Sequence, residues 1–171
     1  MDGSTLTLTL RLIHILGGIF WVGTAILIAW FLVPTLHATS REGGVFMQHL
    51  MQRRGLQVFL LIAMVLTVLS GLAMYARIAA ATHGSWARTA PGIAYGVGAV
   101  AAILGGATGA LISGSAARRL SAIGVSTGPS GPSAEQQTEM VRLQGRMGLG
   151  SKASALLLVI AAAAMAVARY L

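Results

Sequence analysis

One histidine of this chain lies where an ionisable side chain is costly. His14 is the only one of four histidines inside a long apolar segment, about 13 Å along a helix that starts near Thr5 and rises 1.5 Å per residue. Ionisable groups at such depth in a membrane are rare and mark functional sites by default. The alternative is a neutral imidazole that hydrogen-bonds a neighbouring helix. Two interpretations of His14 therefore stay open, a ligand and a packing contact.

If His14 holds haem, as the family resemblance of this helix named below implies, a methionine sulfur is an accepted second axial ligand. Met74 is predicted at a depth comparable to that of His14, whereas Met165 and His83 are weaker candidates. Methionine also fills irregular gaps between helices, so packing is the alternative role of Met74.

Two arginines could accompany such a cofactor. Arg11 lies one turn before His14, and Arg77 lies near the end of the segment that holds Met74. A guanidinium pairs well with a carboxylate, so both side chains could bind haem propionates. Arginines near helix ends also extend to lipid headgroups, which is the alternative role.

Other chemistries lack the residues that they need. The chain has no cysteine, which excludes disulfides, thiolate metal sites and a cysteine nucleophile. Met47, His49 and Met51 are ligand types that suit Cu(I), but on a helix the histidine points away from both methionines. No carboxylate is predicted inside the membrane, which argues against a proton-coupled transporter, because all four acids lie in termini or loops: Asp2, Glu42, Glu135 and Glu139.

The composition places these residues in a membrane. Apolar residues are 56% of the 171 residues and charged residues only 9%, compared with about 25% in soluble domains. A helix needs about 20 apolar residues to cross a bilayer. Four segments meet this requirement, and they predict a single-domain, all-α, integral membrane four-helix bundle over residues 1–171: 10–33, ending at Pro34, then 56–78, 92–112 and 149–168.

Charge predicts the orientation. The connections after the first and third spans hold eight basic residues and the opposite side holds four, so both termini are expected outside and the two longer connections in the cytoplasm. The net charge of +8 then reflects topology, and no nucleic-acid partner is expected. Two helices are expected to extend into the cytoplasm: residues 45–54, as an extension of span two, and residues 135–146, which follow a capping box at Ser133 and Gln136.

Small residues on the third span predict close helix packing. They let two backbones approach, and this contact drives helix association in lipid. The face could pack inside the bundle, form a homo-oligomer or partner interface, or leave room for a flat cofactor. Its residues are Gly98, Ala102, Gly106, Gly105 and Gly109.

The stretch from Arg11 to Gly23, with His14 seven residues before Trp21 and a later Pro34, resembles the first helix of small bacterial membrane proteins of the CopD and HemJ-like group. The resemblance implies an inner-membrane location. It also implies haem b bound through His14, as in HemJ-type proteins, or copper handling, as in CopD-type proteins. It covers about 25 residues of helix one, and a second histidine inside a span is absent from the sequence.

Three functions follow as hypotheses. The first is haem b held by His14 for membrane redox chemistry, with electrons from a quinone or a partner protein. The second is a non-catalytic accessory subunit of a larger membrane complex. The third is copper handling of the CopD type.

Overall fold

The computed structural model describes residues 3–126 and 131–171, apart from the side chains of residues 37, 40–42 and 126. These residues form six α-helices: α1 (Gly3–Leu27), α2 (Val33–Gln48), α3 (Leu56–Ala81), α4 (Ala90–Thr108), α5 (Ser115–Ser126) and α6 (Ala134–Ala168). Three π-helical segments and one 3-10 turn join them: η1 (Ile28–Leu32), η2 (His49–Arg53), η4 (Gly109–Gly114) and η3 (Trp86–Arg88). The described residues include no strand, which confirms the all-α prediction.

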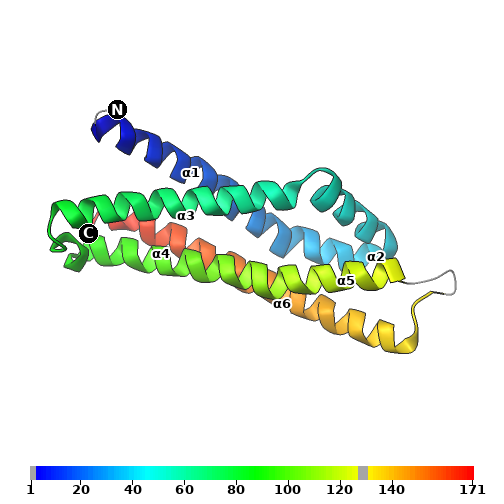
Figure 1. Ribbon diagram of the computed structural model, residues 1–171. Helices are drawn as coiled ribbons and strands as arrows, with labels where there is room; N and C mark the ends of the chain where they lie inside the picture. The colour runs from blue at the N-terminus through cyan, green and yellow to red at the C-terminus, as the bar shows by residue number, and fades with distance from the viewer. Residues whose placement is uncertain (1–2, 127–130) are drawn as a thin grey trace.

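Four helical segments are long and apolar enough to cross a bilayer: Gly3–Leu36, Leu56–Ala81, Ala90–Val125 and Ala134–Ala168. Each contains one of the four predicted spans, so the chain is a multi-pass membrane protein. α1 packs mainly along α3, and α4 packs along α6. Both termini lie at one end of the elongated bundle, called here the terminal end (Figure 1). α2, α5 and the first turns of α6 lie at the other, called the basic end.

The first helix does not stop at Pro34, contrary to the prediction. Helical structure continues from α1 through η1 into α2, where Pro34 occupies the first turn. Proline lacks an N–H and crowds the carbonyl four residues before it. In η1 the helix widens into a π turn, and the N–H of Val33 bonds the carbonyl of Ile28, five residues earlier. This wider turn makes room for the ring, so the helix passes the proline instead of ending there.

At the basic end, the predicted extension of span two is wrong, and the predicted capping box of α6 is confirmed. Residues 45–54 do not extend span two as one helix, because Gly55 has a φ of 71° and separates η2 from α3. Only glycine adopts this left-handed conformation without steric cost. The capping box of α6 is present, because Ser133 accepts from the Gln136 N–H while the Gln136 side chain accepts from the Ser133 N–H. α4 also continues through η4 into α5, which adds a further extension at this end.

Small residues bring α4 and α6 into contact. A Cβ added at Gly98 would lie 3.1 Å from the carbonyl oxygen of Ala161, and one at Gly105 would lie 3.2 Å from that of Ser154. The Ser154 hydroxyl donates to the carbonyl of Gly105 at 2.7 Å across the same interface. Farther toward the basic end, Gly150 of α6 lies instead against the side chains of Ser113 and Ile112 in η4. Backbone approach is therefore the main packing device of this helix pair.

At the terminal end, aromatic side chains join α3 to α4. The Tyr75 and Trp86 rings meet edge to face with centroids 5.2 Å apart, and the Trp86 and Tyr95 rings stack at 6.0 Å. Tyr75 also donates to the carbonyl of Gly92 at 3.4 Å. This cluster sets the position of α4 relative to α3 next to their connecting turn.

We predict that Gly150→Ala weakens the contact between η4 and α6. The new methyl group would lie 2.6 Å from the Ser113 hydroxyl and 2.7 Å from a methyl group of Ile112, so the helices must separate slightly. Overpacking of this kind costs about 1–3 kcal/mol of unfolding free energy. The measurement is the detergent-denaturation midpoint of the purified protein.

The matched control for that variant is Gly145→Ala on the same helix, where an added Cβ meets nothing within 4 Å. Helix propensity there favours alanine by about 1 kcal/mol, so stability should stay equal or rise. Equal losses for the two variants would contradict the contact described for Gly150.

Candidate functional site

The imidazole of His14 lies in the contact between α1 and α3. Its Nδ1 is 2.8 Å from the carbonyl oxygen of Thr67. A carbonyl only accepts hydrogen bonds, so Nδ1 carries the proton and Nε2 of the neutral ring is the acceptor. A Cβ added at Gly71 would lie 2.7 Å from Cε1, 2.9 Å from Nδ1 and 3.7 Å from Nε2. The Nδ1–Cε1 edge of the ring therefore fills the space that Gly71 leaves, and Nε2 is directed away from that glycine.

Polar groups of α3 surround this contact. The Ser70 hydroxyl is shared between the carbonyls of Leu66 and Thr67, at 2.5 and 3.1 Å. The Thr67 hydroxyl is buried without a hydrogen-bond partner and faces Gly17, where an added Cβ would lie 2.6 Å from it. A glycine Cα–H directed at an oxygen is a common weak contact between packed helices. Gly17 and Gly71 thus let α1 approach α3 on both sides of the His14 contact.

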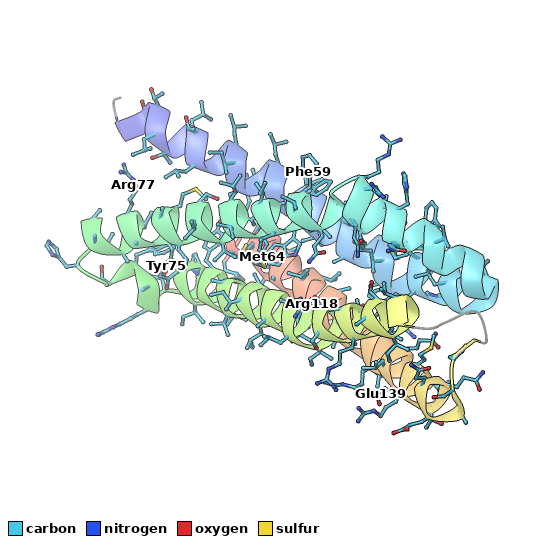
Figure 2. All side chains as sticks on the ribbon, turned by 45° about the vertical axis from the view of Figure 1, so that its right-hand side comes forward. Phe59, Met64, Tyr75, Arg77, Arg118 and Glu139 are labelled. Atoms are coloured by element: carbon cyan, nitrogen blue, oxygen red, sulfur yellow. The ribbon has the colours of Figure 1, made fainter. Side chains whose placement is uncertain are left out.

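The predicted partners of His14 are near it but do not touch its ring in the α1–α3 contact. Met74 is half-buried on α3, one turn beyond Gly71. Arg77 is exposed and reaches back to the first turn of α1, where its guanidinium is 3.7 Å from a Cβ added at Gly3 (Figure 2). Arg11 is also exposed. Both guanidinium groups are open to headgroups or to an anionic ligand at the terminal end.

The two weaker ligand candidates are placed elsewhere. Met165 packs against Gly98 in the α4–α6 contact, with its Cγ 2.9 Å from an added Cβ. His83 is exposed in the turn between α3 and α4 and has a φ of 50°. Neither position brings a side chain to the α1–α3 contact that holds His14.

The candidate copper residues do not converge. Met47 and Met51 are half-buried while His49, where η2 begins, is exposed. This arrangement agrees with the opposite directions expected on a helix. Within the described residues, no group of three or more histidine, cysteine, aspartate or glutamate side chains is arranged to hold a metal ion.

The small residues of the third span are used inside the chain. Gly98 and Gly105 face α6, and Gly109 lies beside the Ser154 hydroxyl, 3.0 Å from an added Cβ. Gly106 instead faces α3 and α1, with an added Cβ 3.0 Å from the Met64 sulfur and 3.2 Å from the Trp21 ring. Ala102 packs against the core cluster of Trp21, Ala63 and Leu158. The face is therefore shared among α6, α3 and α1, and the pattern needs no second chain to explain it.

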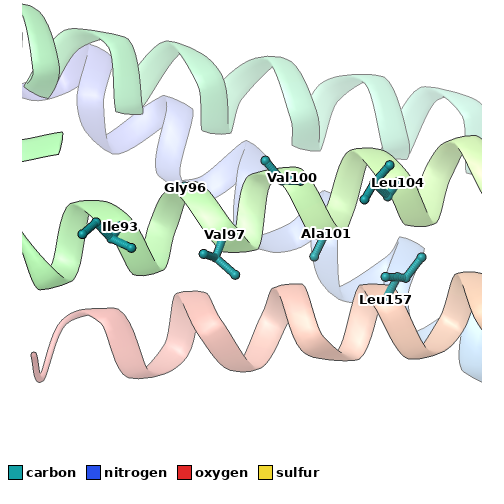
Figure 3. Close-up of a pocket in the computed structure, with 7 residues that line it drawn as sticks. All are labelled: Ile93, Gly96, Val97, Val100, Ala101, Leu104 and Leu157. Atoms are coloured by element: carbon teal, nitrogen blue, oxygen red, sulfur yellow. The ribbon is translucent and has the colours of Figure 1, made fainter. Parts of the chain in front are cut away.

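Two apolar recesses open on the described surface. The first, of about 420 Å³, lies on the side of α4 and α6 and is lined by Ile93, Val97, Val100 and Leu157 among others (Figure 3). The second, of about 430 Å³, lies between α3 and α4 over Trp21 and Gly106. His14 lines neither recess. Neither of these two recesses therefore offers a cavity of cofactor size beside the His14 ring.

One ion pair is present in the described residues, far from His14. Arg142 donates two hydrogen bonds of 2.9 Å to Glu139 on the exposed surface of α6. These hydrogen bonds hold the pKa of Glu139 below its ordinary value, with a smaller contribution from the charge of Arg142. The pair contributes to α6 only above that lowered pKa, and because neither side chain is buried its effect is small.

Sequence reasoning found His14 but not what holds it. Thr67 and Ser70 are polar residues near the middle of an otherwise apolar span, and Gly71 follows them directly. Polar side chains at that depth must find partners inside the protein, and this is the signal that could have identified α3 as the neighbour of His14.

Comparisons of the chain with family models, with curated proteins and with solved structures found no match. The resemblance of residues 11–23 to the CopD and HemJ-like group therefore stays a prediction, and the geometry of the His14 contact carries the functional argument.

We predict that Gly71→Ala displaces the imidazole of His14. The methyl group would take the space of the Nδ1–Cε1 edge, and the hydrogen bond to Thr67 would break. In ¹⁵N-labelled protein, the protected Nδ1–H signal of His14 should be lost, and unfolding free energy should fall by about 1–3 kcal/mol.

Gly18→Ala is the matched control for that variant, because its added Cβ makes an ordinary 3.7 Å contact with a Thr67 methyl group in the same interface. It should leave the Nδ1–H signal in place. Retention of the signal in Gly71→Ala would mean that His14 is not held as described.

Proposed function

We propose that this chain is a non-catalytic accessory subunit of a larger membrane complex, in which His14 holds α1 against α3. The observation that carries the proposal is the hydrogen bond from His14 Nδ1 to the Thr67 carbonyl, made by a ring that fits the space at Gly71. Other polar groups between the helices act similarly, since Ser154 donates to Gly105 and Ser113 donates to the Met147 carbonyl at 3.3 Å. Such bonds typically contribute about 0.6 kcal/mol each between membrane helices. Polar side chains inside the bundle thus serve helix association.

Exposed apolar side chains at the basic end support a role as a subunit. Phe46 on α2, Val125 on α5 and Val141 on α6 are 56%, 78% and 69% exposed. The arginines along these segments favour a position outside the hydrocarbon. Large apolar groups exposed to water are typical of surfaces that bind another protein. The bundle would then be the membrane anchor, and its basic end the surface that contacts the complex.

The distribution of basic residues supports the cellular arrangement. With eight basic residues in the connections at the basic end and four on the other side, the positive-inside rule favours an orientation with both termini outside. The bacterial cytoplasmic membrane is proposed from the resemblance of residues 11–23 alone. In this orientation the apolar side chains of α2, α5 and α6 face the cytoplasm.

A second candidate, haem b bound through His14, is favoured by one feature of the same contact. Donation from Nδ1 to a backbone carbonyl is the usual way in which a ligating histidine is oriented, and it leaves Nε2 as the lone-pair donor. Haem would supply one-electron transfer when bound. Its plane does not fit between α1 and α3, where the ring already fills the space at Gly71, so it would need the side of His14 that faces away from α3. Arg11 could hold a propionate there, whereas Met74 and Arg77 belong to α3 and could serve as second ligand and propionate partner only on the side of His14 that faces α3.

His14→Asn separates the two candidates. The asparagine Nδ2 can replace the donor Nδ1, but asparagine offers no ligand in place of Nε2. If His14 is a packing contact, His14→Ala should lower unfolding free energy by about 1 kcal/mol and His14→Asn should retain most of it. The protein purified from haem-sufficient cells should be colourless.

A Soret band in the wild-type protein that both His14→Ala and His14→Asn abolish would instead establish haem binding and contradict the packing role. Copper analysis of the same samples tests the CopD-type alternative, for which stoichiometric copper lost in His14→Ala would be decisive.

Membership of a complex is tested at Phe46. In mild detergent, the wild-type chain should run within an assembly larger than its own 17.6 kDa in native mass spectrometry. Phe46→Ala should raise the fraction of free chain severalfold, because it removes an apolar contact outside the membrane. Phe59→Ala is the matched control, since Phe59 is 62% exposed within the membrane-spanning part of α3 (Figure 2). A wild-type chain that is always monomeric, or equal effects of the two variants, would contradict the proposal.

A further inference from the structure

The recess between α3 and α4 is built from both helices and from the ring of Trp21. Its eleven lining residues are apolar and include Met64 and Val68 from α3, and Gly106 and Ala110 from α4 and η4. Trp21 is only 6% exposed, and its ring lies over Gly106, so it forms the floor. The recess lies within membrane-spanning segments and opens sideways, where hydrocarbon surrounds the protein.

The shape and lining of the recess suit a hydrocarbon chain. It extends along α4 and η4 from Ala102 to Leu111, which is about 13 Å at 1.5 Å per residue. The recess is open on one side and has a volume of about 430 Å³. An extended acyl chain can lie along it without a polar partner, because every lining residue is apolar.

The recess runs toward the basic end of the bundle. α3 and α4 are antiparallel, with Tyr75 beside Gly96 at the terminal end and Met64 beside Gly106 nearer the middle. Arg118 on α5 lies beyond Leu111 in this direction, with one guanidinium nitrogen 3.6 Å from a Cβ added at Gly114. Arg53 and Arg54 come just before α3, on the other side of the break at Gly55. In Figure 2, Met64 lies between the two helices and Arg118 lies farther toward the basic end. Guanidinium groups therefore lie at the level where the headgroup of a lipid in the recess would be.

These arginines are available to an anion. Arg53, Arg54 and Arg118 are exposed, and the one ion pair of the described residues uses Arg142 and Glu139 instead. A phosphate accepts charge-assisted hydrogen bonds from guanidinium groups. Each basic residue near a membrane surface favours anionic lipid by about fivefold in binding constant.

We propose that the recess between α3 and α4 is a binding site for an anionic phospholipid. One acyl chain lies over Trp21 and Gly106, and the phosphate binds Arg118 together with Arg53 or Arg54. The apolar lining selects hydrocarbon, and the arginines select the headgroup charge. This site is separate from His14 and does not depend on the function proposed above.

Quenching of Trp21 fluorescence by brominated lipid tests the proposal directly. The chain has three tryptophans, so a Trp30→Phe/Trp86→Phe background leaves Trp21 as the only emitter. This protein is reconstituted into phosphatidylcholine vesicles that contain, at equal mole fraction, either mid-chain dibrominated phosphatidylglycerol or dibrominated phosphatidylcholine. At each mole fraction the anionic brominated lipid should quench Trp21 more strongly, and a titration should give half-maximal quenching at a severalfold lower mole fraction than with phosphatidylcholine.

Two variants locate the binding determinants. Ala110→Leu fills the recess and should remove the additional quenching by phosphatidylglycerol, whereas Ala163→Leu, on an exposed position of α6 outside both recesses, should not. Arg118→Gln should reduce the preference for the anionic lipid about fivefold, with further loss on adding Arg53→Gln and Arg54→Gln.

Equal quenching by the two brominated lipids in the unaltered recess would overturn the proposal, because it would show only bulk lipid contact. Absence of quenching by either lipid, with crosslinking between two chains at Ala110, would assign the recess to a second copy and would also overturn it.

Discussion

The structure depends on the requirement that polar groups inside a bilayer find partners within the protein. Water is absent there, so a buried donor such as the N–H of His14 is costly unless a neighbouring helix accepts it. The Thr67 carbonyl does so at 2.8 Å, and this bond is possible only because Gly71 leaves space for the ring. Ser154 and Gly105 repeat the arrangement between α4 and α6. In each helix pair, a polar side chain and a glycine opposite it together determine the distance between the two helices.

This packing mode also explains where the bundle is less tightly filled. Backbones approach closely where glycines face carbonyl groups, in the α1–α3 and α4–α6 pairs. Between α3 and α4 the contacts are the aromatic cluster at the terminal end and the Met64–Gly106 contact nearer the middle. The apolar recess over Trp21 lies between these helices, on the side of the Met64–Gly106 contact that faces the basic end. The helix pair with few close backbone contacts is therefore the one that leaves an open apolar surface.

The candidate site was visible in the sequence only in part. His14 was identified from its depth, because an ionisable residue in an apolar segment is conspicuous. Arg11 is placed near it by helical spacing, but Met74 and Arg77 are placed by depth alone, and depth does not specify direction around a helix axis. In the structure the ring faces Thr67 and Gly71, while the two arginines are exposed around that contact. The glycine pattern of the third span looked like one face, yet it divides between α6 and the pair of Trp21 and Met64.

Composition and spacing alone determined that the chain is an all-α, four-span membrane protein, because the length of an apolar run and the bilayer thickness are directly comparable. They also located the capping box of α6, since that signal is contained in four consecutive residues. The passage through Pro34, the break at Gly55 and the partner of His14 were decided only by tertiary structure. Each depends on backbone geometry or on the rotation of one helix against another. Hydrophobicity cannot specify that rotation, because lipid and neighbouring helices are equally apolar surroundings for a side chain.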